Sequence, residues 1–396
     1  MRIAMLDPSA FTIPYDAHLC RALAQAGSVV EFYTRPARKL DYFPKSVYDS
    51  TIVGEQSYDT VEHFYRVSEQ FFLVAKFPLL KMGIKGVEHA LNMVSLIQKL
   101  RRFRPDAIHM QWLVIPGLDR HFVRRLRKLA PVILTVHDIK ACLSPSNRLQ
   151  TAGWTSALAE FDGLIVHTKI GKQSLVSEGI KDSKISIVPH GVFDMSLNNK
   201  HAEGRSSHSE TWNLLAFGAI KPYKGLDVLI RALAELPKLV RSKVRLIIAG
   251  NPCVSARQLR SLAVECGVDD CIEWILRFIK DDEVPELFHR SDVVVFPYKS
   301  IDASGVLMTA LPYGKTIVAS RLGLFNEIFQ DGETAMLVEP DNPFELAAAL
   351  ATIYENPVWA RKMGHRSAEL AKDVCSWDRI AKQTIAVYRR VTKECM

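Results

Sequence analysis

FPYKSIDASGVLMTALPYGKTIVAS, residues 296–320, contains the pattern from which the architecture of the chain can be predicted. It begins with the end of a hydrophobic strand and continues through the polar loop YKSIDASG and a helix that opens at Ser304 or Gly305. It then returns as the short strand KTIVAS. A strand, a helix and a second strand in this order predict two parallel strands joined by a crossover helix. The unpaired backbone amides at the start of that helix can hold an anion.

The same alternation extends through the chain. Before residue 196, the strand-like segments are RIAMLD, SVVEFYT, PDAIHMQW, PVILTVHD, FDGLIVHT and KISIVPHGV, separated by stretches with helical spacing. After residue 211, WNLLAFGAI, KVRLIIAG, CIEWILR and SDVVVFPY alternate with helical segments in the same way. Repeated strand and helix units predict parallel sheets with helices on both faces.

The polar segment SLNNKHAEGRSSHSET, residues 196–211, interrupts this alternation and is predicted to link two domains. We expect an amino-terminal domain at 1–195, a carboxyl-terminal domain at 212–375, and a final helix at 376–396 that can cross back to the first domain. The predicted fold class is α/β, with two doubly wound, Rossmann-like domains facing a cleft. Open α/β sheets bind ligands at the carboxyl ends of their strands, so the ligand site is expected in that interdomain cleft.

Composition narrows the class of protein. The chain has 396 residues, of which 48% are hydrophobic, enough for two substantial cores. No run of about eighteen apolar residues predicts a membrane-spanning helix, and MRIAMLDPSA reads as a first strand instead of a signal peptide. The seven cysteines show no C-x-x-C spacing, which favours reduced, mostly buried thiols over a zinc site or disulfides. These features predict a cytoplasmic protein.

The formal net charge of +8 is unevenly distributed, with a basic patch between residues 99 and 128. Such a patch attracts the phosphates of lipids or nucleic acid, and a solvated basic face is the alternative. Nucleic acid is not expected, because the patch has no interleaved aromatic residues and no recognised binding motif. Phe122, Leu126 and Leu129 lie near one helical face, which suits either the membrane interface or packing on the sheet. The predicted contacts of a peripheral protein with an anionic membrane surface are Arg101, Arg102, Arg124, Arg125, Arg127 and Lys128.

Three strand ends of the second domain are candidates for binding an anion. Gly218 ends one strand and is followed by Lys221 and Lys224, Gly250 ends another, and the helix at Ser304 follows a third. Glycine lets the backbone approach a ligand closely, and two ammonium groups can neutralise a diphosphate. The alternative is a surface turn with solvated lysines, and Lys224 is expected to be exposed without ligand.

These segments resemble a known family. FGAIKPYKGLDVLIRAL, LIIAGNP, SDVVVFPY, SGVLMTALPYGKTIVAS and GLFNEIFQDGETAMLVEPDNPFELAAAL are similar to the nucleotide-sugar half of retaining glycosyltransferases of family 4, which have the GT-B fold. The resemblance is strong over residues 212–350 and weaker in the first half, where it rests on AIHMQW, LTVHD and VPHGV. It implies a nucleoside-diphosphate sugar of UDP or GDP type as donor substrate, with no cofactor. No Asp-x-Asp cluster follows a strand, so no metal is expected.

By this resemblance, Gly218 and Lys224 match the glycine and the lysine that bind the donor diphosphate. Ala219 stands where the family usually has arginine, and Lys221 can supply that charge without arginine's bidentate fork. His137 matches a histidine that hydrogen-bonds a hydroxyl of the donor sugar, and a structural cap at the strand end is the alternative.

The main departure from the family concerns two glutamates. Members usually carry them eight positions apart, one near the donor sugar and one on the ribose, and Ile301 and Thr309 stand there in this chain. Asp302 can serve the sugar, and Thr309 can contact the ribose more weakly than a charged acceptor would. The predicted phosphate cradle then consists of the amides of Ser304, Gly305 and Val306.

The amino-terminal loop PSAFTIPYD departs as well, because members often have a pair of glycines there. Phe11 and Tyr15 suggest a bulkier wall on the acceptor side. Asp16 lies beside them, and capping of the following helix is favoured over a chemical role.

The sequence thus predicts a retaining, metal-independent glycosyltransferase. It would move a sugar to a hydroxyl of an acceptor glycan or glycolipid, in the assembly of bacterial surface polysaccharide or glycolipid. Lys221, Lys224 and the cradle would stabilise the departing diphosphate, while His137 and Asp302 contact the sugar. The alternative is a non-catalytic GT-B subunit that regulates an active relative, favoured by the missing glutamates and opposed by the retained Lys224 and His137. A nucleotide-sugar epimerase of the same fold fits less well.

Overall fold

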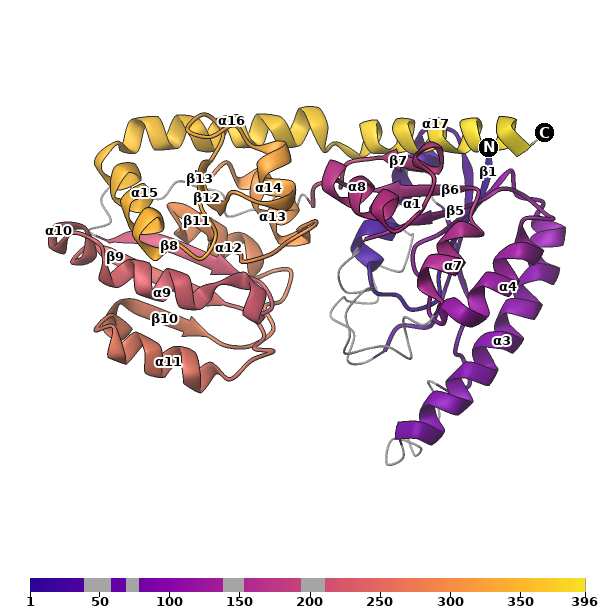
Figure 1. The fold of residues 1–396 in the computed structure, drawn as a ribbon, viewed down its shortest axis with the longest axis horizontal. Coiled ribbons are helices and arrows are strands. Elements are labelled where there is room, and N and C mark those ends of the chain that lie inside the picture. The colour runs from indigo at the N-terminus through magenta and orange to yellow at the C-terminus, as the bar shows by residue number, and fades with distance from the viewer. Residues whose placement is uncertain (39–57, 69–77, 138–152, 194–210, 396) are drawn as a thin grey trace. The chain divides into compact units, whose positions relative to one another are not determined.

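The computed structural model describes residues 1–38, 58–68, 78–137, 153–193 and 211–395. The chain divides into two compact units, one formed by Met1–Gly191 with Trp377–Met396 and the other by Val192–Ser376 (Figure 1). The predicted linker, 196–211, lies outside the described residues except for Thr211. Each unit is an α/β domain built on its own parallel sheet, which confirms the predicted fold class.

The first unit contains a seven-stranded parallel sheet in the order β3-β2-β1-β4-β5-β6-β7. Its strands are β1 (Arg2–Asp7), β2 (Val29–Thr34), β3 (Asp59–Glu62), β4 (Ala107–Met110), β5 (Val132–Thr135), β6 (Gly163–Val166) and β7 (Ile185–Ile187). Its helices include α1 (Ile13–Gln25), α3 (Pro78–Phe103), α4 (Pro116–Leu126), α7 (Trp154–Ala159), α8 (Lys169–Ser177), η3 (Asp182–Lys184) and α17 (Trp377–Cys395).

The second unit contains a six-stranded parallel sheet in the order β10-β9-β8-β11-β12-β13. Its strands are β8 (Trp212–Phe217), β9 (Val244–Ala249), β10 (Ile272–Ile275), β11 (Val293–Phe296), β12 (Thr316–Ser320) and β13 (Met336–Val338). Its helices include η5 (Pro222–Lys224), α9 (Leu226–Ala234), α10 (Lys238–Arg241), α11 (Ala256–Glu265), η6 (Asp269–Cys271), α12 (Val284–Arg290), α13 (Gly305–Ala310), η7 (Leu311–Tyr313), α14 (Gly323–Ile328), α15 (Pro343–Glu355) and α16 (Pro357–Val374).

Strand order determines where a ligand can bind in each unit. The first strand of each unit lies inside its sheet, with β1 between β2 and β4 and β8 between β9 and β11. At such a reversal the loops after the two neighbouring strands run to opposite faces and leave a crevice at the carboxyl ends. The candidate residues should therefore be sought after β1 and β4, and after β8 and β11.

The last helix, α17, packs against α1 and completes the first unit. The Tyr388 hydroxyl lies 2.6 Å from Nδ1 of the buried His109. The Trp377 ring covers Gly191 so closely that a Cβ there would lie 2.5 Å from a ring carbon. The carboxyl-terminal segment therefore supplies part of the core near the ends of the first sheet's strands.

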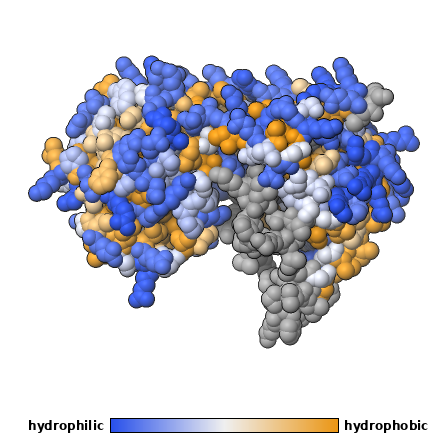
Figure 2. All heavy atoms as spheres, viewed as in Figure 1, coloured by the Kyte–Doolittle hydropathy of each residue, from blue (hydrophilic) through white to orange (hydrophobic). Residues whose placement is uncertain are grey.

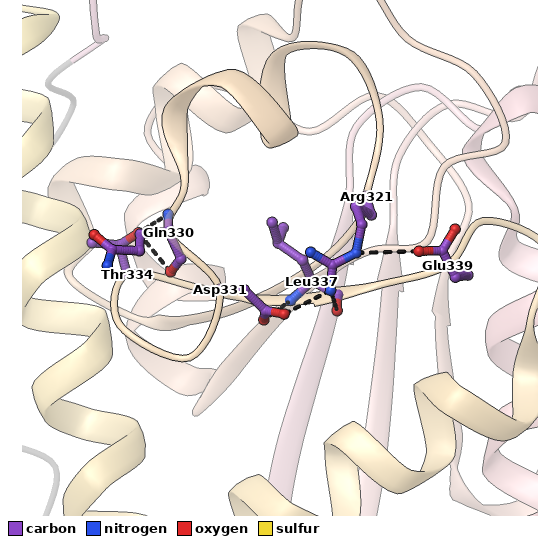
Figure 3. A network of polar contacts seen from close by, with 6 residues as sticks. All are labelled: Arg321, Gln330, Asp331, Thr334, Leu337 and Glu339. Carbon is purple, nitrogen blue, oxygen red and sulfur yellow. Dashed lines mark hydrogen bonds and ion pairs between the residues drawn. The ribbon is translucent and has the colours of Figure 1, made fainter.

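A polar network holds the edge strand β13 in place (Figure 3). The guanidinium group of Arg321 lies 2.6 Å from the Asp331 carboxylate and 3.2 Å from that of Glu339, and it donates to the Leu337 carbonyl oxygen. The other oxygen of Asp331 accepts the backbone N–H of Leu337 at 2.9 Å. Exposed ion pairs contribute little individually, so the hydrogen bonds to the β13 backbone are the part of this network that fixes the strand.

Two helical glycines provide a test of packing in the second and first units. Gly364 of α16 lies on the turn before β12, where a Cβ would meet the Gly314 carbonyl oxygen at 2.4 Å, whereas a Cβ at Gly83 of α3 meets nothing within 4 Å. We expect Gly364→Ala to lower the free energy of unfolding by about 1–3 kcal/mol through overpacking. Gly83→Ala, the matched control, should raise it by up to about 1 kcal/mol. Urea unfolding of both variants checks the contrast, and an unchanged Gly364→Ala variant would mean that α16 packs less tightly than described.

Candidate functional site

The ends of β8 and β9 and the start of α13 converge in the second unit. Gly218 has a φ of 96°, and a Cβ there would lie 2.8 Å from both Lys224 Nζ and a methyl group of Val306. A Cβ at Gly250 would lie 2.1 Å from the Gly218 carbonyl oxygen. The structure therefore brings together four of the predicted donor-site residues, and no side chain fits at either glycine.

Lys224 lies under this crevice, and the expectation that it is exposed is wrong. It is 6% exposed, its Nζ donates to the Phe217 carbonyl oxygen at 3.2 Å, and it lies 5.5 Å from the centre of the Tyr298 ring. Burial, with a further contribution from the nearby charge of Lys221, lowers the pKa of Lys224 to about 8. An anion bound beside Nζ would reverse this effect and favour the ammonium form.

Helix α13 begins at Gly305, in agreement with the predicted opening at Ser304 or Gly305. Ser304 is its N-cap, and the Ser304 hydroxyl accepts the backbone N–H of Leu307 at 3.1 Å. Within the described residues, the N–H groups of Gly305 and Val306 have no acceptor and the buried hydroxyl of Tyr298 has no hydrogen-bond partner. Unpaired donors beside Lys224 suit a phosphate group.

The residues predicted to replace the two glutamates are less well placed. Thr309 is 7% exposed, and its hydroxyl donates to the Gly305 carbonyl oxygen at 3.1 Å, so it has only acceptor capacity left for a ribose hydroxyl. Asp302 and Ile301 are half-buried in the loop before α13. Lys221 is exposed and lies 6.0 Å from the centre of the Tyr223 ring, where a solvent-side phosphate could reach it.

In the first unit, His137 belongs to a cluster of four histidines. His109 lies in β4, and His137, His167 and His190 follow β5, β6 and β7. The Tyr15 ring lies 4.8 Å from the ring centre of His137, 5.4 Å from that of His167 and 5.0 Å from that of His190. Burial lowers the pKa to about 3 for His109 and His190 and to about 4 for His167, and lowers the pKa of His137 well below its usual range. The four rings are therefore neutral near pH 7.

Hydrogen bonds and ring contacts hold His137 in place. His167 donates from Nδ1 to the Val188 carbonyl oxygen at 3.0 Å, because that oxygen can only accept, and its Nε2 lies 3.2 Å from His137 Nδ1. The Nε2 of His137 lies 2.8 Å from the side-chain oxygen of Gln111, to which it donates. The His137 ring also stacks on Trp112.

The amino-terminal loop differs from the acceptor wall predicted for it. Tyr15 is 2% exposed and Asp16 is fully buried, so neither side chain reaches solvent, whereas Phe11 is 70% exposed. Asp16 does not cap α1, because the helix begins at Ile13 with Thr12 as N-cap. Asp7 instead orders this loop by accepting the backbone N–H groups of Ser9 and Ala10.

The basic patch separates into paired and unpaired residues. In α4, Arg124 pairs with Glu160 at 2.5 Å and Arg127 with Asp162 at 2.6 Å. Phe122 and Leu126, expected to suit either a membrane interface or packing on the sheet, are 5% and 0% exposed and pack in the core of the first unit. The structure therefore supports the second alternative for this apolar face.

Sequence reasoning missed Gln111, His167 and His190. Each lies just after a strand, in AIHMQW, GLIVHT and ISIVPH, and carboxyl ends of parallel strands meet at one edge. A polar residue recurring at that position was the available signal. Among the described residues, no group of three or more His, Cys, Asp or Glu is arranged to hold a metal ion, and no helix has the length and apolarity needed to span a membrane.

The buried histidines make the stability of the protein depend on pH. The folded-state pKa values of His109, His167 and His190 lie below the unfolded value of about 6.5, so the folded state binds fewer protons and stability is lost as pH falls below about 6.5. Asp16 acts in the opposite direction, because burial raises its pKa. We expect the free energy of unfolding to fall between pH 6.5 and 5, and His167→Gln to reduce that slope by about 1.4 kcal/mol per pH unit. Urea titrations at several pH values measure it, and an equal slope for the variant would contradict a neutral His167.

Both halves of the chain match sequence models of glycosyltransferase families. Residues 17–193 match the family described as Glycosyltransferase Family 4, and residues 199–372 match Glycosyl transferases group 1. The first match ends before the predicted linker, 196–211, and the second begins inside it, at residue 199.

Relatives with a curated name are called D-inositol 3-phosphate glycosyltransferase. That of Corynebacterium efficiens is 31% identical over 317 residues, which is 73% of this chain and 72% of the relative. That of Pseudarthrobacter chlorophenolicus is 28% identical over 94% of this chain and 89% of the relative. The match to the protein of a Nocardioides species, 29% identical over 63% of this chain, spans only 58% of that protein's length.

Solved structures show the same fold. HepE of Anabaena in complex with UDP and glucose has a TM-score of 0.72 at 16% identity, over 98% of this chain and 100% of that chain. Sucrose-phosphate synthase of Thermosynechococcus elongatus has a TM-score of 0.72 at 19% identity, over 100% of both chains. With its two Rossmann-like domains, its two family matches and these relatives, the chain belongs to the group 1 and family 4 glycosyltransferases of the GT-B fold.

Proposed function

We propose that the protein is a retaining glycosyltransferase that moves a sugar from a nucleoside-diphosphate donor to an acceptor hydroxyl. The observation that carries the proposal is the crevice formed by Gly218, Gly250, the buried Lys224 and the unpaired amides of Gly305 and Val306. A departing diphosphate gains negative charge, and donors fixed in advance at that position stabilise it. Retention of configuration rests on the resemblance alone.

The first unit would supply the polar contact to the sugar. His137 places a neutral ring at the carboxyl end of β5, held by Gln111 and His167. A neutral polar group beside the sugar would not oppose the positive charge that develops on the sugar ring. Asp302 remains the proposed carboxylate for the sugar, and Thr309 the proposed ribose contact.

The donor is proposed to be a UDP sugar, since HepE, which shares the fold, was crystallised with UDP and glucose. The acceptor is proposed to be a phosphorylated polyol, as the name of the relatives suggests, or a glycan or glycolipid of the bacterial surface. A panel of UDP, GDP and ADP sugars with these acceptors, read by product mass, tests the proposal. The protein would need neither metal nor cofactor, so activity should persist in a chelator.

A non-catalytic regulatory subunit is the alternative, favoured by Ile301 and Thr309 at the positions of the glutamates. It predicts nucleotide binding without turnover on any donor in the panel. For location we propose a cytoplasmic protein held peripherally at an anionic membrane.

Lys224 should be required for turnover. We expect Lys224→Met, which keeps an apolar stem in the buried space, to lower turnover by about two to three orders of magnitude through loss of one charged transition-state contact. The matched control Lys221→Met removes an exposed ammonium and should cost less. Product formation measures both, with thermal unfolding to verify folding. Full activity of Lys224→Met would remove this residue from the site.

Binding of the nucleoside diphosphate should weaken in alkaline solution. The pKa of Lys224 is about 8 in the free protein, and a bound diphosphate raises it, so binding above pH 8 must first protonate the amine. We expect UDP affinity to be constant below about pH 8 and to fall by up to about ten-fold per pH unit above it. Titration calorimetry at pH 7, 8 and 9 tests this for the wild type and Lys224→Met, and an equal pH dependence for the variant would assign the titration to another group.

A further inference from the structure

Helix α3 presents a row of apolar side chains to solvent. Ile84, Val87, Leu91 and Val94 are 40%, 64%, 64% and 45% exposed. Their spacing of three, four and three residues places them on one face of the helix. Figure 2 shows hydrophobic surface over the part of the first unit where Figure 1 places α3. Exposed apolar rows of this kind mark interaction surfaces more often than isolated apolar residues do.

The opposite side of α3 packs into the core of the first unit. His89, Met93, Leu96, Leu100 and Phe103 are all buried, and the four apolar ones belong to the core of the first unit. The solvent row lies across the helix from them. None of its four side chains belongs to the core of the first unit as the described residues form it.

The apolar row leads directly to a cluster of arginines. Arg101 and Arg102 lie in the last turn of α3. Each residue turns a helix by about 100°, so both arginines lie on the same face as the apolar row, within an arc of about 100°. The row and the two arginines together extend along about 27 Å of the helix. Arg2 and Arg104 join them around a surface hollow of about 570 Å³, with Phe103 in its wall. The guanidinium carbon of Arg2 lies 4.7 Å from the centre of the Phe103 ring.

None of these four guanidinium groups has a carboxylate partner among the described residues. Asp106, two residues after Arg104, uses its carboxylate to accept the backbone N–H of Arg2 at 2.7 Å. Arg104 has a φ of 51°, unusual for a residue with a side chain, and its backbone N–H bonds to the Leu100 carbonyl oxygen. The hollow therefore holds four like charges that no carboxylate of the described segments balances, in contrast to the paired Arg124 and Arg127 at the end of α4.

We propose that the exposed face of α3 and the arginine hollow at its end dock on a bilayer that carries anionic phosphate headgroups. The apolar row would enter the boundary between headgroups and acyl chains, and the guanidinium groups would bind phosphates by paired hydrogen bonds. Arg2 begins β1 and the hollow lies at the amino ends of the strands, so docking leaves the carboxyl end of β5, with His137, uncovered. This inference locates the proposed peripheral association and does not depend on glycosyl transfer.

The first experiment tests the charges. Full-length protein is sedimented with vesicles of phosphatidylcholine, with or without phosphatidylglycerol, and binding is expected only with phosphatidylglycerol and to weaken with salt. Arg101→Gln with Arg102→Gln should lower binding by about 25-fold, about five-fold for each charge near the surface. Arg124→Gln with Arg127→Gln removes the same charge from paired positions and should change binding by less than about three-fold.

The second experiment tests the apolar row. Val87→Ser with Leu91→Ser should weaken vesicle binding by about ten-fold or more, including at high salt, where electrostatic attraction is screened. The matched control is Leu239→Ser with Val264→Ser, which changes side chains of similar exposure, 72% and 66%, in the second unit. This control should bind vesicles as the wild type does.

Several outcomes would overturn the proposal. If both α3 variants bind vesicles as the wild type does, this surface does not contact the membrane. If the wild type binds equally well to phosphatidylcholine alone, anionic headgroups are not what it recognises. Binding of inorganic pyrophosphate in the hollow without vesicle binding would make it a site for a soluble anion. A dimer in sedimentation equilibrium that Leu91→Ser dissociates would assign the row to a second copy of the chain. Because none of these measurements uses turnover, a failure here is distinct from a failure of the proposed enzymatic function.

Discussion

The close approach of two backbone segments at Gly218 and Gly250 is the constraint on which the crevice of the second unit depends. A Cβ at position 250 would lie 2.1 Å from the Gly218 carbonyl oxygen, and one at Gly225 would lie 1.8 Å from that of Pro297. These contacts bind the ends of β8, β9 and β11 into one rigid edge, with no side chains between the backbone and a ligand. Lys224 is fixed by the same geometry, since its ammonium group rests on the carbonyl oxygen at the end of β8.

The parts of the fold that local sequence patterns control could be predicted. Alternating strands and helices, the glycines at strand ends and the start of α13 near Ser304 depend on propensities and caps that act over a few residues. The burial of Lys224 could not be predicted, because it depends on the ring of Tyr298, 74 positions further along the chain, covering the lysine. Periodicity likewise shows that α4 has an apolar face, but whether that face is buried depends on tertiary packing. In the structure the α4 face is buried, and the exposed apolar row lies on α3.

The two units place opposite kinds of polar group at their strand ends. Four histidines at the edge of the first sheet are neutral near pH 7, and three of them, His137, His167 and His190, surround the ring of Tyr15. The second sheet ends in ammonium groups and unpaired amides. The two edges therefore differ in charge: the first carries neutral rings, and the second carries the positive charge and unpaired donors that suit a phosphate group.

The electrostatic surroundings of Lys224 favour a bound anion. Carboxylates near an ammonium group raise its pKa, whereas Lys221 and burial lower it here, and no carboxylate partner of Lys224 occurs among the described residues. At position 309 a threonine hydroxyl is already committed to the Gly305 carbonyl oxygen and adds no charge. The crevice therefore has unbalanced positive charge until an anion enters it. A phosphate group bound there would supply that balance through charge-assisted hydrogen bonds.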